Sequence, residues 1–115
     1  MNKKFLHVEG FAVLALSLYF YWSNQFSWGL FLILLFLPDI SMLGYLLNNK
    51  VGAIIYNLFH TYVMTILVIL CGLFFSNAIV LAIGIIWTAH IGMDRMIGYG
   101  LKYPTAFKDT HLNRV

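Results

Sequence analysis

Four long apolar stretches, separated by short polar loops, constrain this chain more than any other feature of its sequence. They cover approximately residues 5–22, 28–47, 51–75 and 78–97. A transmembrane helix needs about 20 predominantly apolar residues. With 62% hydrophobic and 10% charged residues, the chain is much less charged than a soluble domain, in which about a quarter of the residues are charged. The sequence therefore predicts an integral membrane protein.

The short connections favour antiparallel neighbours, so the expected fold class is an all-α antiparallel four-helix bundle. The bundle covers residues 1–97 and is followed by a polar tail of residues 98–115. The Lys and Arg residues lie near the amino terminus, in the second loop, at the end of the last stretch and in the tail. Such residues gather on the cytoplasmic side, so we expect a multi-pass protein of the cell membrane with both termini cytoplasmic. The basic residues are too scattered for nucleic acid. The expected partners are membrane lipids and further copies of the chain.

Glu9, Asp39, His60, His90 and Asp94 lie inside the predicted spans, all in the half nearer the cytoplasm. At about 1.5 Å per residue, Asp39 lies roughly 12 Å and His60 about 13 Å from the cytoplasmic ends of their spans. The corresponding depths are about 10 Å for His90, 4 Å for Asp94 and 6 Å for Glu9. Ionisable groups at membrane depth normally face a bundle interior, because exposing them to lipid is costly. We therefore expect these five side chains to form one cluster.

Two imidazoles and three carboxylates are a ligand set typical of zinc, manganese or iron. His90 and Asp94 are four residues apart, so they lie on one face of a helix. We expect His60, His90 and Asp94 to bind a divalent metal, with Asp39 as an alternative ligand. Glu9 or the remaining aspartate would act as the general base. A metal-free buried network that holds the helices together stays open as an alternative.

Polar residues close to this predicted cluster, or in the tail, are candidates for substrate binding. They are Asn57, Arg95, Tyr99, Lys102 and His111. Asn57 could instead bridge two helices, and Arg95 or Lys102 could receive an anionic lipid headgroup. Gly98 and Gly100 permit a sharp turn, by which the tail would either cover the site or anchor at the membrane surface.

These residues favour a metal-dependent membrane hydrolase that acts on a lipidic or amphipathic substrate. Two other functions stay open. One is a redox module with His60 and His90 as the axial ligands of a haem. The other is a proton-coupled carrier or channel subunit, which would use the same buried ionisable groups.

Three runs of sequence carry a family resemblance. They are H-I-G-M-D-R-M-I-G-Y-G-L-K-Y-P-T-A-F-K-D-T-H-L from residue 90, H-V-E-G from residue 7 and F-L-P-D from residue 36. Over essentially its whole length the chain resembles DUF4260, a family of small bacterial membrane proteins, which implies class and boundaries but no activity. A looser similarity, in short spans, P-D and buried histidines, is to membrane-bound metal-dependent hydrolases of the YdjM type. This chain lacks the further Asp and His residues that follow P-D in those proteins.

Overall fold

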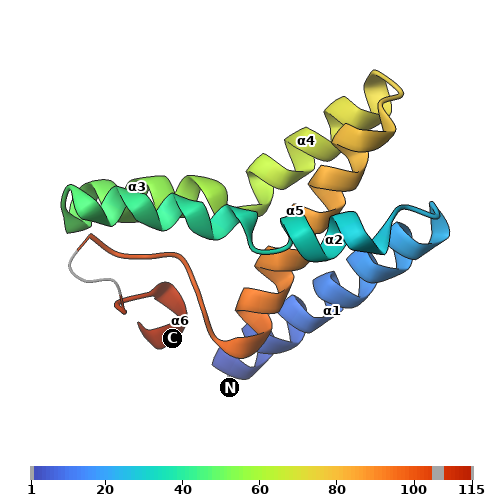
Figure 1. Cartoon of the computed structure of the whole chain (residues 1–115). Coiled ribbons are helices and arrows are strands. Elements are labelled where there is room, and N and C mark those ends of the chain that lie inside the picture. Colours follow the sequence, from blue (N-terminus) through green and yellow to red (C-terminus); the bar gives the residue numbers. More distant parts are fainter. Residues whose placement is uncertain (1, 105–107, 115) are drawn as a thin grey trace.

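The computed structural model describes residues 2–104 and 108–114, and within them it contains helices and no strand (Figure 1). The elements are α1 (Asn2–Ser23), α2 (Trp28–Leu34), the 3-10 helix η1 (Leu37–Leu46), α3 (Asn49–Phe59), α4 (Tyr62–Phe74), α5 (Ala78–Ile97) and α6 (His111–Arg114). Four segments are long and apolar enough to cross a membrane: Asn2–Ser23, Trp28–Leu46, Asn49–Phe74 and Ala78–Ile97. The all-helical class and the four apolar segments are confirmed.

The polar loops end the helices where the sequence predicts. Ser27, Asn48 and Asn77 precede α2, α3 and α5, and the side chain of each accepts a hydrogen bond from an amide of the first turn. These bonds satisfy donors that an isolated helix start leaves unpaired. Gly98 ends α5 with a φ of 106°, a conformation that glycine adopts without steric cost.

The long helix α5 packs antiparallel against both α1 and α4 (Figure 1). Glycines set these contacts at backbone distance. A Cβ added to Gly92 would lie 2.8 Å from the amide nitrogen of Leu14, and one added to Gly72 would lie 2.6 Å from that of Leu81. Small residues allow such close approach between membrane helices, where packing rather than the hydrophobic effect drives association. We call α1, α4 and α5 the long-helix unit.

The second and third apolar segments are both interrupted, so the straight four-helix bundle that the sequence predicts is not observed. The second segment changes from α2 to η1 just before Pro38. A proline ring clashes with the carbonyl four residues earlier, here that of Leu34, which is the last residue of α2. The third segment is interrupted by His60 and by Thr61, whose backbone is extended. In Figure 1, η1 and α3 form a helical hairpin that leaves the long-helix unit at a large angle.

Side chains of α5 compensate for the interruption of the third segment. The indole Nε1 of Trp87 donates to the carbonyl of Phe59 at 2.6 Å, and Nη2 of Arg95 donates to the carbonyl of His60 at 3.0 Å. An interrupted helix at membrane depth is tolerated where neighbouring groups satisfy the freed carbonyls. The hairpin is therefore attached to α5 at its point of interruption.

The tail turns back and runs below α3 (Figure 1). Lys102 and Thr110 form an isolated antiparallel bridge. On either side of it, the Tyr103 amide donates to the Asp109 carbonyl at 2.8 Å and the His111 amide to the Leu101 carbonyl at 2.9 Å. The described residues of the tail therefore turn back on themselves and towards α3, which is one of the two arrangements that the sequence left open.

Candidate metal centre

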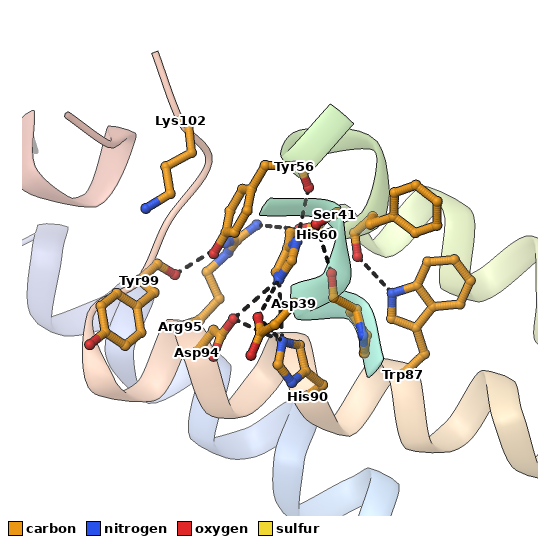
Figure 2. Close-up of polar contacts among 12 residues, drawn as sticks. Asp39, Ser41, Tyr56, His60, Trp87, His90, Asp94, Arg95, Tyr99 and Lys102 are labelled. Carbon is orange, nitrogen blue, oxygen red and sulfur yellow. Dashed lines mark hydrogen bonds and ion pairs between the residues drawn. The ribbon is translucent and has the colours of Figure 1, made fainter. Parts of the chain in front are cut away.

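Four ionisable side chains from three elements meet where the helices are interrupted (Figure 2). Asp39 comes from η1, His60 directly follows α3, and His90 and Asp94 come from α5. One ligand atom from each residue lies within 4.8 Å of the other three. The side chains of His60 and His90 are 1% and 0% exposed, that of Asp94 is 9% exposed, and that of Asp39 is 33% exposed. The cluster is thus buried and accessible on the side of Asp39.

The ligand atoms are close enough together to share one ion. Nε2 of His60 lies 3.2 Å from Nε2 of His90, 3.3 Å from Oδ1 of Asp39 and 3.5 Å from Oδ2 of Asp94. Nε2 of His90 lies 3.2 Å from each of the same two oxygens. Metal–nitrogen and metal–oxygen bonds of about 2.0–2.2 Å place neighbouring ligand atoms roughly 3–4 Å apart. These five distances lie in that range, and the remaining pair, the oxygens of Asp39 and Asp94, lies within 4.8 Å.

The orientation of His60 is fixed by its own helix. Its Nδ1 lies 2.9 Å from the carbonyl of Tyr56, so this nitrogen carries the proton and Nε2 presents a lone pair to the cluster. A histidine that ligates a metal is commonly held in this way by a carbonyl or carboxylate on its other nitrogen. The Tyr56 ring also stacks on the imidazole, with centroids 3.7 Å apart. Sequence reasoning missed Tyr56, although its position one turn before His60 places it on the same helix face.

His90 is held differently. Its Nδ1 is buried without a hydrogen-bond partner among the residues that the structure describes. Packing orients the ring instead: Phe36 contacts it edge-on, with centroids 6.2 Å apart. Because Nε2 is the nitrogen that faces Asp39, Asp94 and His60, it is the atom of His90 that is available to a metal.

A cavity of about 260 Å³ adjoins the cluster on its carboxylate side. Its lining residues are Asp39, Met42, Tyr56, Asp94, Tyr99 and Lys102. Lys102 is 6% exposed, and its Nζ lies 4.8 Å from the centroid of the Tyr56 ring. Burial lowers the pKa of the Lys102 ammonium group. The cavity therefore brings a buried cation close to the two carboxylates, and of the predicted substrate-binding residues Tyr99 and Lys102 line it.

Glu9 does not join the cluster, and its predicted place there is wrong. It is exposed on α1 and lines a different cavity, together with Arg95. Its neighbour Gly10 is the residue of α1 that contacts α5 at backbone distance, so Glu9 is turned away from the contact. A depth estimate gives the height of a residue along a helix but not the direction of its side chain.

The remaining predicted substrate residues make internal contacts. Asn57 donates through Nδ2 to the carbonyl of Lys102 at 2.8 Å and accepts from its amide at 2.6 Å, which ties the tail to α3. Nδ1 of His111 accepts a hydrogen bond from the amide of Leu101 at 2.8 Å. Arg95 donates to the carbonyls of His60 and Tyr99.

Comparison with known proteins gives one match. The family model described as "Domain of unknown function (DUF4260)" matches residues 3–115. No curated protein and no solved structure matches the chain. What the site does is therefore inferred from its own geometry.

Proposed function

Since this chain belongs to the DUF4260 family, whose description assigns no activity, we propose its function from the cluster itself: a metal-dependent hydrolase of the membrane. Asp39, His60, His90 and Asp94 would hold one divalent ion. The observation that carries the proposal is the close spacing of their ligand atoms, 3.2–3.5 Å between each histidine nitrogen and the other ligand atoms, with all four atoms within 4.8 Å of one another. Two imidazoles with two carboxylates suit zinc, manganese or iron.

The same spacing favours a single ion over a haem. A haem with two axial histidines has to fit its ring between their ligand nitrogens. Here the nitrogens of His60 and His90 are 3.2 Å apart, and a carboxylate oxygen of Asp39 lies 3.2–3.3 Å from both. That arrangement leaves no room for a porphyrin.

A divalent ion held in this cluster would supply Lewis acidity, polarising a substrate oxygen and lowering the pKa of water. The chain supplies the other parts of the reaction. Asp39 directs Oδ1 to both histidines and is the more exposed carboxylate, so its Oδ2 is our candidate to accept a proton from water. Lys102 would bind an anionic group of the substrate in the adjoining cavity or donate a proton to the leaving group. Tyr99, in the wall of the same cavity, would help to orient the substrate.

The substrate would be amphipathic, because the cavity combines charged groups with apolar surroundings. Its lining contains Lys102 beside two carboxylates, while the adjoining hairpin exposes large apolar side chains such as Leu43 and Ile40. We also propose that the site faces the cytoplasm, since Lys and Arg cluster near this end of the predicted spans. A reporter fused to the carboxyl terminus should then be active in the cytoplasm.

The test is hydrolysis by protein purified from membranes, with amphipathic phosphate esters and carboxylate esters as probes. We expect turnover that a chelator removes and the returned metal restores. Lys102→Met should keep the metal but lose turnover, since Lys102 is not a ligand. Lys108→Met, at an exposed lysine of the tail, is the matched control and should keep both. A metal-loaded protein that cleaves neither class of ester, or an unchanged rate in Lys102→Met, would contradict the proposal.

A further inference from the structure

A second, larger groove lies between α1 and α4. One cavity, of about 640 Å³, is bordered by the first half of α1, the start of α4 and Arg95. A second, of about 430 Å³, is bordered by the second half of α1 and by the α4–α5 hairpin. Val13 lines both cavities, so they adjoin along α1, and we call the two together the α1/α4 groove. It is distinct from the cavity beside the metal centre.

The part of this groove beyond Val13 is apolar. It is lined by Leu16, Phe20, Ile69, Leu73 and Ile85, with Asn24 at its far end. From Gly10 to Asn24 the groove follows α1 for roughly 21 Å at 1.5 Å per residue. Half of a bilayer's hydrocarbon core is about 15 Å thick. An extended acyl chain can therefore lie along it.

The other end of the groove contains a buried guanidinium group. Arg95 is 9% exposed, and among the described residues it donates hydrogen bonds to the carbonyls of His60 and Tyr99, at 3.0 and 3.3 Å, and lies 5.9 Å from the centroid of the Tyr62 ring. A guanidinium has five N–H donors. Arg95 forms no ion pair with any residue in the described part of the chain. A buried charge without a counterion is strongly unfavourable, so this end of the groove is suited to an anion.

The neighbouring carboxylates do not fill that role. Asp94 directs Oδ2 to the two histidines, and a metal in the cluster would neutralise it. Glu9 lines the same cavity as Arg95 but is exposed and forms no ion pair in the described structure. Arg95 lies two residues before the end of α5, about 3 Å along the helix axis. That depth is close to the level of lipid headgroups.

We propose that the α1/α4 groove binds one phospholipid of the bilayer. Its phosphate pairs with Arg95, whose planar guanidinium group suits phosphate oxygens, and one acyl chain lies along Val13 towards Asn24. The lipid phosphate would form the direct ion pair that Arg95 does not make with any described residue. This site does not depend on the metal or on hydrolysis, and it gives Arg95 a role other than substrate binding at the metal centre.

The test measures lipid that stays with purified protein. The protein is exchanged into a mild detergent, its bound phospholipid is identified by native mass spectrometry, and short-chain phosphatidylglycerol is then titrated back. We expect about one phospholipid per chain, bound at least about tenfold more weakly in Arg95→Gln, as expected for a lost charge-assisted pair. Lys50→Gln removes one exposed cation at the hairpin tip and should bind as the wild type does.

A second variant keeps the proposal testable if Arg95→Gln does not fold, since Arg95 also bonds to the carbonyl of His60. Val13→Trp fills the groove where its two cavities meet and leaves Arg95 in place, so it should lose the lipid but keep the metal content of the wild type. Val8→Trp, at an exposed position on the same helix, is its matched control and should keep both.

Three results would overturn the proposal. One is wild-type lipid binding in both Arg95→Gln and Val13→Trp. Another is equal competition by inorganic phosphate, which would show an anion site without a lipid chain. The third is a change from dimer to monomer in Val13→Trp with lipid binding unchanged, which would assign the groove to a second copy of the chain.

Discussion

The contacts within the long-helix unit differ in kind from the contacts that attach the η1/α3 hairpin to the rest of the chain. In the long-helix unit, Gly10, Gly72 and Gly92 bring helices to backbone contact. The hairpin is attached to α5 and to the tail by polar side chains, among them Trp87 and Asn57. Uninterrupted helices satisfy their own backbone groups and need only a complementary shape. Interrupted helices leave carbonyls that other side chains must satisfy, and the candidate metal site lies at those interruptions.

This difference predicts unequal sensitivity to substitution. A contact at backbone distance cannot be relieved by a change of rotamer, so enlarging one residue should disrupt the whole unit. A single hydrogen bond contributes about 0.5–1.5 kcal/mol, so removing one polar anchor should loosen only the hairpin or the tail. The following variants test this, from the largest expected effect to the smallest.

Gly92→Leu should have the largest effect. Its Cβ would lie 2.8 Å from the Leu14 amide nitrogen and 2.9 Å from the Gly10 carbonyl oxygen. Overpacking typically costs about 1–3 kcal/mol, and more is expected here because both neighbours are backbone atoms. Size-exclusion chromatography in detergent should show loss of the folded monodisperse protein. Gly29→Leu, whose Cβ would meet only Ser27 Oγ at 3.5 Å, is the control. A well-folded Gly92→Leu protein would show that the long-helix unit is not held by close packing.

Asn57→Ala should release the tail without affecting the long-helix unit. It removes two hydrogen bonds to the Lys102 backbone, which together contribute about 1–3 kcal/mol. Hydrogen exchange should become faster at the Lys102 amide and stay unchanged in α1 and α5. Asn24→Ala, which removes one local bond to Phe20, serves as control. An unchanged exchange rate at Lys102 in Asn57→Ala would mean that other contacts hold the tail.

Trp87→Phe should weaken the attachment of the hairpin slightly. The phenyl ring keeps the stacking on Phe59, whose centroid lies 5.7 Å from the indole, but loses the Nε1–H bond to the Phe59 carbonyl. We expect a loss of about 1 kcal/mol in the free energy of unfolding, measured in a mixed-detergent titration. Trp28→Phe, at the start of α2 and outside the hairpin, retains ring contacts with Tyr21 and Phe31 and is the matched control. An equal loss of unfolding free energy in both variants would show that the hydrogen bond to the Phe59 carbonyl does not anchor the hairpin.

Among these changes, acidification should have the smallest effect on the attachment of the tail. Burial, and then the charge of Arg95, lower the pKa of His111 below its usual value of 6.5. The released tail therefore binds more protons than the docked tail. Docking is fully favoured above pH 6.5 and weakens as the pH falls below it, because a proton on Nδ1 would oppose the Leu101 amide that now donates to it. The hydrogen-exchange rate of the Leu101 amide, after correction for the pH dependence of intrinsic exchange, should rise at low pH in the wild type. In His111→Gln the corrected rate should not depend on pH. An unchanged rate in the wild type would contradict this role of His111.

Hydropathy predicted α1 and α5, because each is one continuous apolar stretch, whereas α4 is the second half of the interrupted third stretch. It did not predict the interruption at His60, which depends on Trp87 and Arg95 approaching from a helix about 30 residues away. Pro38 was a visible signal for the other interruption, but a proline in a membrane helix is compatible with a kink as well as with a new direction.

Among the site residues, depth along each span correctly predicted that Asp39, His60, His90 and Asp94 would meet. The same reasoning failed for Glu9, because a helix packed through Gly10 must turn the adjacent side chain away from the contact. The closeness of Asp39 to both histidines also made it a candidate ligand. From the sequence alone, Asp39 could be either a metal ligand or the general base.

The most direct test of this account is metal analysis of the purified protein, combined with X-ray absorption at the edge of the metal found. The account predicts about one zinc, manganese or iron ion per chain, with nitrogen and oxygen neighbours at about 2.0–2.2 Å. It also predicts loss of that ion in His90→Ala, in a protein that still inserts into the membrane. Folded wild-type protein that takes up no divalent metal, or that keeps its ion in His90→Ala, would contradict the account and leave the cluster as a metal-free network between helices.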